Sequence, residues 1–476
     1  MAEIVSSRWK QWSKVLLVLL GLAVLVTVPR ILEPPHPTGI PENIKSFSLE
    51  GYQKLLVVAP HCDDETLGAA GLMLAAQRTG MQVRVVIETN GDGFYFATAE
   101  DFHTIRPSAS DYVRMGEIRQ DESLAALEIL GIKNKQVSFL GYPDRGTPSE
   151  WNDNWSIQNP YRSPYSQDSH SPYANTFDSQ SVYAGEDLLK DVTTIIDNYR
   201  PDLIVYPNPD DVHPDHWGMN AFTRMAIAEI SHTDPNYLPT QLTYLVHRPD
   251  FPTTRGLKPQ LGLIPPPALL AIYPRWVHWD LTQEDVRRKG MAVQAYKSQL
   301  PLLHGLLESF VRSNELYAFA NPVTLDMAAE GNPDDPLTWK NKNGALIQPV
   351  ERDPVGDFFV RRAFPSADLV AAFFARGKTN SLWICSQARD DTAFDLTYQL
   401  RIKILNGNSV EEFNATTGKQ EPGWDKATRK GIYICAQTSL EQSGNPWAFF
   451  IGSDVVGGGR LMDQTGWQLV TVPSSY

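Results

Sequence analysis

Short apolar runs alternate with segments of helical periodicity through residues 51–320. Residues 55–59 and 203–206 are continuous apolar runs, which is typical of strands buried on both faces. Between them, the apolar side chains of residues 188–199 fall on one helical face. The same patterns predict further strands over 83–87, 137–140 and 242–246, and helices over 66–78, 119–130 and 214–230. Alternating strands and helices predict an α/β fold, with a mostly parallel sheet covered by helices on both faces.

The pattern changes to the two-residue period of strands after residue 350. Residues 398–404 alternate apolar and polar positions, and Asn406-Gly407 then marks a turn. Residues 447–451 and 467–472 are further strand candidates. This tail is therefore expected to form a β-sandwich-like accessory domain.

A different apolar pattern opens the chain. Residues 15–28 form an unbroken apolar run, which is shorter than the ~20 residues of a spanning helix and long for a signal-peptide core. We favour an uncleaved membrane anchor over a removed signal peptide, because no small-x-small cleavage site follows the run. Arg8, Lys10 and Lys14 precede it and Arg30 alone follows closely, which predicts a cytoplasmic N-terminus with the body of the chain outside the cytoplasmic membrane.

Composition divides the rest of the chain. The Pro-rich start of residues 31–50 is typical of a spacer, and residues 321–350 are rich in Asp, Asn and Pro, as linkers are. The expected domains are a membrane anchor or signal segment over 1–30, a linker over 31–50, a Rossmann-like α/β domain over 51–320, a second linker over 321–350, and a β-rich domain over 351–476. Within the α/β domain, residues 145–183 are irregular and rich in Trp and Tyr. They could form either a sugar-stacking face or a surface loop packed on its own side chains.

Charge and cysteine usage narrow the chemistry. The formal net charge is -13, with no strongly basic stretch in the body of the chain, which argues against a nucleic-acid partner. None of the three cysteines forms a C-x-x-C pair, so a thiolate zinc site is not expected. Cys385 and Cys435 lie in similar apolar contexts and could form a disulfide across a sheet or remain two buried thiols.

Two polar segments follow predicted strands directly. Ala59-Pro60-His61-Cys62-Asp63-Asp64-Glu65 follows the first strand, and Asp211-Val212-His213-Pro214-Asp215-His216 follows the strand over 203–206. Open α/β sheets place their sites at the carboxyl ends of parallel strands. If the two strands are neighbours, the two segments meet in one crevice.

These segments supply the donors of a catalytic zinc site. His61 and Asp64 can point at one atom, and His213 and His216 share one face of a helix. Two imidazoles and one carboxylate complete a catalytic zinc shell with one position left for water, and zinc lowers the pKa of that water toward ~7. Asp63 is placed to accept the proton. The second His of the later segment would stabilise an oxyanion or protonate the leaving amine, with Asp215 holding it charged.

Both segments resemble those of the PIG-L/LmbE-like family of N-acetylglucosaminyl deacetylases, whose hallmark is Pro/Ala-His-Pro-Asp-Asp-Glu followed by His-Pro-Asp-His. The resemblance covers roughly residues 52–320. It implies zinc ligands His61, Asp64 and His216, with Asp63 as general base. It further implies that His213, oriented by Asp215, stabilises the oxyanion and can serve as acid.

The resemblance extends to weaker features. Arg119 would contact substrate, or would instead form a structural ion pair with Glu122, and Asp144 matches a family Asp near the site. A Tyr of the irregular loop could reach the oxyanion. The sequence departs from the family at Cys62, where relatives carry Pro. We interpret Cys62 as a small buried residue rather than as a thiolate ligand.

The sequence thus predicts a zinc-dependent hydrolase that removes an N-acyl group, most simply acetyl, from an amino sugar or glycoconjugate. The alternative is a metal-dependent amidase acting on a non-sugar substrate. Because two His and one carboxylate also bind Fe²⁺, an iron oxygenase is a rival from another class, against which the additional base Asp63 argues. A third rival is a catalytically silent glycan-binding protein, which would be expected to lack Asp63 or a metal ligand. The oligomeric state is left open.

Overall fold

The computed structural model describes residues 40–473 apart from 274, 321, 329, 356–363, 378–380, 408, 420–426 and 440–445. The membrane anchor expected over residues 1–30 lies outside the described residues. Within the described part of the chain, no helix is both long enough and apolar enough to cross a bilayer.

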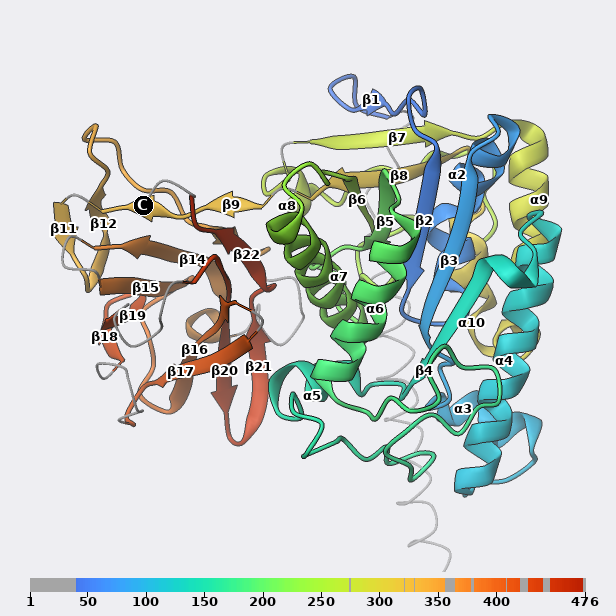
Figure 1. The fold of residues 1–476 in the computed structure, drawn as a ribbon, viewed down its shortest axis with the longest axis horizontal. Coiled ribbons are helices and arrows are strands. Elements are labelled where there is room, and N and C mark those ends of the chain that lie inside the picture. The colour runs from blue at the N-terminus through green and yellow to red at the C-terminus, as the bar shows by residue number, and fades with distance from the viewer. Residues whose placement is uncertain are drawn as a thin grey trace, which may run out of the picture.

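An eight-stranded sheet forms the centre of the α/β region (Figure 1). Its strands lie in the order β1 (Lys45–Ser46), β7 (Trp276–Asp280), β8 (Asn314–Phe319), β6 (Thr240–Tyr244), β5 (Leu203–Pro207), β2 (Lys54–Ala59), β3 (Gln82–Thr89) and β4 (Val137–Tyr142). The five strands from β6 to β4 pair in parallel, whereas β8 pairs antiparallel with both β6 and β7. The chain builds outward from β2 first toward β4 and then, through β5, toward β6. A ligand site is therefore expected at the carboxyl ends of β2 and β5.

Helices cover both faces of this sheet. They are α2 (Asp64–Arg78), α3 (Tyr95–Asp101), α4 (Ala109–Ile129), α5 (Thr147–Asn152), α6 (Gly185–Tyr199), α7 (Pro214–Thr233), α8 (Pro267–Leu270), α9 (Gln283–Val293) and α10 (Leu300–Leu307), with 3₁₀ turns at Asn134–Gln136, Glu308–Phe310 and Pro365–Ala367. Alternate residues of β2 divide between two hydrophobic clusters: Leu55 and Val57 pack with α2, α4 and α9, and Leu56 and Val58 pack with α6 and α7. Burial on both faces explains why the strand is a continuous apolar run.

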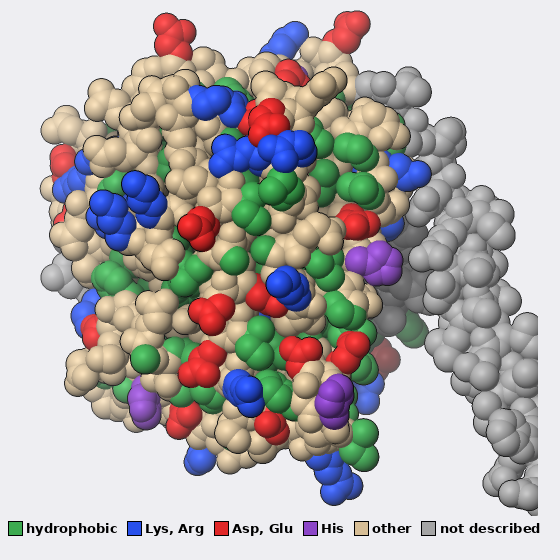
Figure 2. Space-filling model, turned by 90° about the vertical axis from the view of Figure 1, so that its right-hand side faces the viewer, with side chains coloured by type: hydrophobic (Ala, Val, Ile, Leu, Met, Phe, Trp, Pro, Cys, Tyr) green, Lys and Arg blue, Asp and Glu red, His purple; other side chains and the backbone are tan. Residues whose placement is uncertain are grey.

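One helix begins well before its predicted start. The periodicity predicted a helix from Arg119, but α4 starts at Ala109, after a capping box between Ser108 and Asp111. The cap satisfies the first free N–H groups of a helix whose first turns are only partly buried. The outer face formed by α4 and its neighbours shows basic and acidic side chains interspersed with apolar ones (Figure 2).

The C-terminal part of the chain is β-rich, as the alternating pattern predicted. One sheet contains β10 (Asp326–Met327), β14 (Leu369–Arg376), β15 (Ser381–Ala388), β19 (Tyr433–Ser439) and β18 (Thr428–Lys430), with β13 (Glu351–Arg352) beside β14. The other contains β17 (Ser409–Thr416), β16 (Leu396–Asn406), β20 (Ala448–Gly457), β22 (Gln468–Thr471) and β9 (Val323–Thr324), with β21 (Arg460–Gln464) beside β20. Apolar side chains of both sheets, such as Phe374 and Phe449, share one buried cluster.

The stretch 321–350, expected to be a linker, contains short strands. β9 and β10 each join one of the two β sheets, and β11 (Glu330–Asn332) pairs with β12 (Asp335–Lys340) in a small ribbon. β9, β10 and β11 have only two or three residues and show no alternating pattern, and the six-residue β12 opens with Asp335 and Pro336, which is why composition alone suggested a linker.

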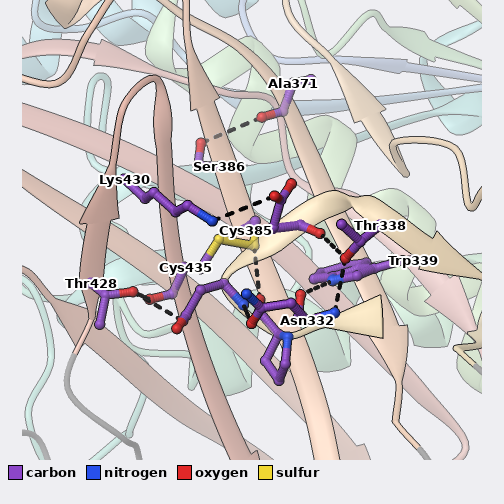
Figure 3. The surroundings of a disulfide bond; sticks show 12 residues. Asn332, Thr338, Trp339, Ala371, Cys385, Ser386, Thr428, Lys430 and Cys435 are labelled. Atoms are coloured by element: carbon purple, nitrogen blue, oxygen red, sulfur yellow. Dashed lines mark hydrogen bonds and ion pairs between the residues drawn. A yellow bond between two sulfur atoms is a disulfide. The ribbon is translucent and has the colours of Figure 1, made fainter. Parts of the chain in front are cut away.

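Cys385 and Cys435 are bonded to each other (Figure 3). They lie directly opposite each other on the antiparallel strands β15 and β19. The disulfide therefore joins two strands of one sheet. The sequence left a disulfide and two buried thiols as alternatives, and the structure contains the disulfide.

The β-rich region packs against the helical layer of the α/β region. The buried Trp151 ring of α5 contacts Phe222 of α7 and also Phe450 and Trp467 of the β-rich region. Arg224 Nη1 donates a hydrogen bond to Trp467 O at 3.1 Å. The hydrophobic cluster around α6 and α7 thus continues into the β-rich region.

A buried ion pair ties three elements of the α/β region together. Lys289 Nζ of α9 lies 2.7 Å from Glu315 Oε1 of β8, and both side chains are fully buried. Glu315 also accepts hydrogen bonds from the N–H groups of Gly71 and Leu72 in α2, while Lys289 donates to Leu67 O. Because each charge has several partners, the pair is satisfied only as a unit.

Removing one member of this pair is expected to be costly. Lys289→Met leaves the Glu315 carboxylate buried without its cation, which should lower the free energy of unfolding by about 3–5 kcal/mol. The double variant Lys289→Met/Glu315→Gln removes both charges and should lose less than Lys289→Met alone. Chemical denaturation followed by circular dichroism measures both. A loss below about 1 kcal/mol for Lys289→Met would show that the pair does not hold these elements together.

Candidate metal centre

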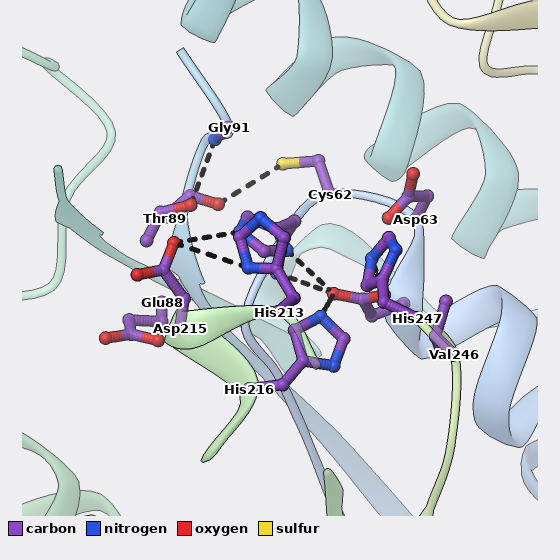
Figure 4. Close-up of polar contacts among 12 residues, drawn as sticks. Cys62, Asp63, Glu88, Thr89, Gly91, His213, Asp215, His216, Val246 and His247 are labelled. Atoms are coloured by element: carbon purple, nitrogen blue, oxygen red, sulfur yellow. Dashed lines mark hydrogen bonds and ion pairs between the residues drawn. The ribbon is translucent and has the colours of Figure 1, made fainter. Parts of the chain in front are cut away.

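The two polar segments meet at one edge of the sheet. β2 and β5 are parallel neighbours, with Leu55 opposite Leu203. The first segment leads from β2 into α2, and the second leads from β5 into α7, so both lie at the carboxyl ends of their strands. The side chains converge above these ends (Figure 4). The sequence hypothesis required this pairing.

Asp64 lies between two imidazoles. Its Oδ2 is 3.1 Å from His61 Nδ1 and 3.0 Å from His216 Nε2, and all three side chains are buried. One ligand atom from each of these residues and one from His247 lie within 4.8 Å of one another. The structure therefore brings together the three predicted ligands and adds a fourth residue that the sequence analysis did not single out.

The donors fit a divalent metal ion. Among the described residues, the buried Asp64 Oδ1 has no hydrogen-bond partner. Burial lowers the pKa of His216, but Asp211 and Asp64 outweigh it and raise this pKa to about 10. The cluster thus favours positive charge at its centre, and imidazole and carboxylate donors suit Zn²⁺ as well as Fe²⁺.

Carboxylates contact the ring nitrogens of the two predicted His ligands that point away from Asp64. Asp211 Oδ2 lies 3.1 Å from His216 Nδ1, and Asp215 Oδ2 lies 3.1 Å from His61 Nε2. Asp144 Oδ1 is 3.5 Å from the same His61 nitrogen. A carboxylate on the far nitrogen fixes the tautomer and ring orientation of a metal-binding His. Asp144, predicted to bind substrate, thus lies beside His61.

Asp63 occupies a strained position at the start of α2. It is the N-cap residue, with φ +152°, a conformation that costs a non-glycine residue roughly 1–3 kcal/mol and persists mainly at functional sites. Its Oδ2 lies 3.7 Å from Arg119 Nη2. Burial and the neighbouring Asp64 raise the pKa of Asp63 to about 8. A carboxyl group that titrates near neutral pH suits a general base.

Arg119 contacts the backbone of the site rather than open solvent. Its guanidinium donates to Gly91 O at 2.7 Å and to Cys62 O at 3.1 Å, and the side chain is buried. Gly91 has φ +64°, and a Cβ there would lie 1.7 Å from Arg119 Nη1, so any other residue at this position would displace the Arg119 guanidinium. The alternative partner Glu122 instead accepts two hydrogen bonds from Ser298. These contacts make Arg119 a positioning group for the first motif loop.

Cys62 lies away from the convergent donors. Its side chain is fully buried and its Sγ lies 4.0 Å from Thr89 O. Burial raises the pKa of the Cys62 thiol well above its usual range, which keeps it protonated. A protonated thiol is a poor metal ligand, in agreement with the interpretation of Cys62 as a small buried residue.

His213 lies at the rim of the site. Its side chain is 20% exposed, and its ring centre is 4.5 Å from that of His61. Asp215, expected to hold His213 charged, has His61 as its nearer imidazole; its Oδ2 is 3.9 Å from His213 Nδ1. Burial and the neighbouring imidazoles hold the pKa of His213 well below its usual range, which favours the neutral ring.

Several aromatics of the irregular loop serve packing. Trp151, Tyr173 and Tyr183 are buried, and the Tyr173 hydroxyl donates to Asp92 Oδ2 at 3.0 Å. Tyr161 and Tyr165 remain partly accessible. These three side chains pack against other parts of the protein, so they form neither an open sugar-stacking face nor a loop packed only on itself.

Two residues of this arrangement were not predicted from the sequence. Asp211 stands in the second motif segment but was given no role, although it contacts His216. His247 follows β6, the strand next to β5, and belongs to neither motif. Its position at the carboxyl end of a predicted parallel strand was the available signal.

The comparisons with known proteins agree with the resemblance. Residues 56–227 match the family model described as GlcNAc-PI de-N-acetylase, PIG-L. A curated relative from Mycobacterium sp. (strain KMS), named 1D-myo-inositol 2-acetamido-2-deoxy-alpha-D-glucopyranoside deacetylase, is 30% identical over 186 residues, which are 39% of this chain and 53% of the relative. A relative of the same name from Corynebacterium urealyticum is 26% identical over 199 residues, covering 41% and 53%. The chain spans about half the length of these relatives.

The structural comparison gives a partial likeness. The N,N'-diacetylchitobiose deacetylase from Pyrococcus horikoshii aligns over 57% of this chain and 85% of its own, with 18% identity and a TM-score of 0.35. A structural likeness with so low a TM-score gives no information about the substrate of this chain.

Asp211 offers a direct test of how the centre is held. Asp211→Asn keeps the shape but weakens the contact that orients His216, so the affinity for Zn²⁺ should fall by roughly 10–100-fold. Competition with a chromogenic chelator measures it. Asp280→Asn, at an exposed carboxylate, is the matched control and should bind zinc like the wild type. Equal zinc affinities for both variants would contradict the orienting role.

Proposed function

We propose that this chain, whose residues 56–227 form a PIG-L family domain, is a zinc-dependent hydrolase that removes an N-acetyl group from an amino sugar or glycoconjugate. The observation that carries the proposal is the convergence of His61, Asp64 and His216 on one buried point, with Asp63 beside it. The names of the curated relatives favour an N-acetylated sugar as the substrate class.

His61, Asp64 and His216 would hold the ion. When bound there, zinc would polarise an amide carbonyl and lower the pKa of a water molecule. The adjacent Asp63 carboxylate accepts the proton from the attacking water, and Arg119 keeps that carboxylate next to the site through its hydrogen bonds to Cys62 O and Gly91 O.

His213 would serve the other side of the reaction. Its partly exposed position at the rim lets the imidazole meet the substrate, while Asp215 lies behind both His213 and His61. A neutral imidazole N–H would stabilise the oxyanion of the tetrahedral intermediate. The proton that Asp63 accepted from water would then pass to the nitrogen and release the amine. Asp144 Oδ1 lies 3.5 Å from His61 Nε2 and would orient the His61 ring. Asp144 could approach the substrate only from the side of the site on which His61 lies.

A metal-dependent amidase acting on a non-sugar substrate is the second candidate, because it would need the same machinery. The acidic net charge and the absence of a strongly basic stretch in the sequence suit a neutral sugar and do not exclude a small neutral amide. The two candidates differ only in whether the rim of the site binds a sugar or a non-sugar group. A substrate panel therefore separates them.

The catalytic prediction concerns Asp63 and His216. Asp63→Asn cannot accept a proton, so acetate release should fall by roughly 100- to 10,000-fold while bound zinc is retained. His216→Ala should lose both zinc and activity. The full-length chain is assayed for acetate release against N-acetylated mono- and oligosaccharides, glycoconjugates and N-acetylated non-sugar amines, with metal content measured in parallel.

Cys62→Ala serves as the matched control in this assay, because Cys62 lies in the same loop but away from the donors. It should keep both metal and turnover. Full turnover by His216→Ala would discredit the assigned centre. Faster turnover of non-sugar amines than of any sugar would favour the amidase.

Two further observations support a proposal for the location of the protein. The Cys385–Cys435 disulfide supports an oxidising compartment, where such bonds persist. The apolar run over residues 15–28, with basic residues before it, supports an N-terminal anchor to the membrane. We therefore place the catalytic domain outside the cytoplasmic membrane.

Protease added to intact spheroplasts tests this location. The α/β region should be digested without lysis, because it would face the protease. A cytoplasmic marker protein checks that the spheroplasts are closed. Full protection of the catalytic domain until lysis would contradict the proposed location.

A further inference from the structure

We propose that His247 is a fourth protein ligand of the metal ion, in addition to His61, Asp64 and His216. The inference rests on the proposed metal centre and extends it. Neither motif contains His247, which follows β6. The ion would then be bound by three imidazoles and one carboxylate, and water or substrate would enter by expanding the coordination number.

The first argument is the position of His247 relative to Asp64. His61 and His216 both contact Asp64 Oδ2, whereas His247 Nε2 faces Oδ1 at 3.9 Å. That oxygen is the buried one without a hydrogen-bond partner among the described residues. A separation of 3.9 Å is too long for a direct hydrogen bond and is compatible with two ligands on one ion. His247 therefore approaches the centre from the side that the motif histidines leave open.

The second argument is the relative orientation of the rings. The His247 ring plane lies at 81° to that of His216 and at 84° to that of His61, with ring centres 4.7 and 6.3 Å apart. Stacked histidines would lie nearly parallel. Rings carried by different elements approach one point from different directions, and Figure 4 shows His216 on one segment and His247, next to Val246, on another.

The third argument is that the backbone of His247 is fixed to the motif loop. Asp211 Oδ2 accepts hydrogen bonds from Val246 N at 2.8 Å and His247 N at 2.9 Å. The same oxygen faces His216 Nδ1, and Val212 N donates to His247 O at 3.0 Å. One carboxylate thus positions a predicted ligand and the proposed one together. Three adjacent strands, β2, β5 and β6, each contribute to the centre from their carboxyl ends.

A role in orienting Asp64 alone is the main alternative for His247. The two roles predict different losses of metal affinity and different spectra of the bound metal. Losing an outer partner of a ligand costs roughly 10–100-fold in metal affinity, so loss of a ligand should exceed that range. Loss of a ligand also changes the absorption of bound Co²⁺ and the number of imidazoles seen by X-ray absorption, whereas loss of an outer partner leaves that number unchanged.

The experiment uses the full chain loaded with Zn²⁺ or Co²⁺. His247→Ala and His247→Gln, which keeps the approximate length without an imidazole, are compared with the wild type by chelator competition, Co²⁺ absorption and zinc X-ray absorption. Both variants should lose more than about 100-fold in metal affinity and show two imidazoles instead of three. Millimolar imidazole should restore the Co²⁺ spectrum of His247→Ala by filling the space of the missing ring.

His232→Ala is the matched control. His232 lies near the end of α7, roughly 24 Å along the helix from His216, and stacks on Trp447. It should bind metal like the wild type.

Wild-type affinity and spectra in both His247 variants would overturn the proposal, and so would an unchanged imidazole count with a loss of metal affinity below 100-fold. If His216→Ala also keeps its metal, the proposed centre itself is wrong; if only His216→Ala loses it, the centre stands and His247 is not a ligand.

Discussion

The pairing of β2 with β5 is the constraint on which the candidate site depends. It places two segments, about 150 residues apart in the sequence, at one edge of the sheet, where His61 and His216 both meet Asp64. The Asp64 carboxylate is buried between the two imidazoles. A buried carboxylate is costly unless it is paired, so this position favours a positive charge beside it. Strong apolar burial of both strands maintains the pairing, since β2 contributes alternate residues to the clusters on the two faces.

The other contacts around the site have a common effect, which is to limit movement of the two motif loops. Arg119 holds the first loop through backbone carbonyls, and Asp211 holds the second loop and the end of β6. The β-rich region packs on α5 and α7, the helix that carries His216. It therefore supports the layer behind the second loop, at a distance from the reacting groups.

Much of the fold could be predicted from the sequence, because strands buried on both faces are continuous apolar runs and strands with one buried face alternate. The three motif ligands could be predicted because they stand close together in two short segments. His247 could not, since its proximity to Asp64 arises from the pairing of β6 with β5 and from no local spacing. The start of α4 and the strands of residues 323–340 were missed for another reason. The partly exposed first turns of α4 and the strands β9, β10 and β11, of two or three residues each, have no apolar period to detect, and β12 opens with Asp335 and Pro336.

Anomalous X-ray diffraction at the zinc edge, from crystals of the full chain grown with zinc, tests the central claim most directly. The account predicts one strong anomalous peak bounded by His61, Asp64 and His216. The absence of a peak there, or a zinc peak only at other residues, would contradict it.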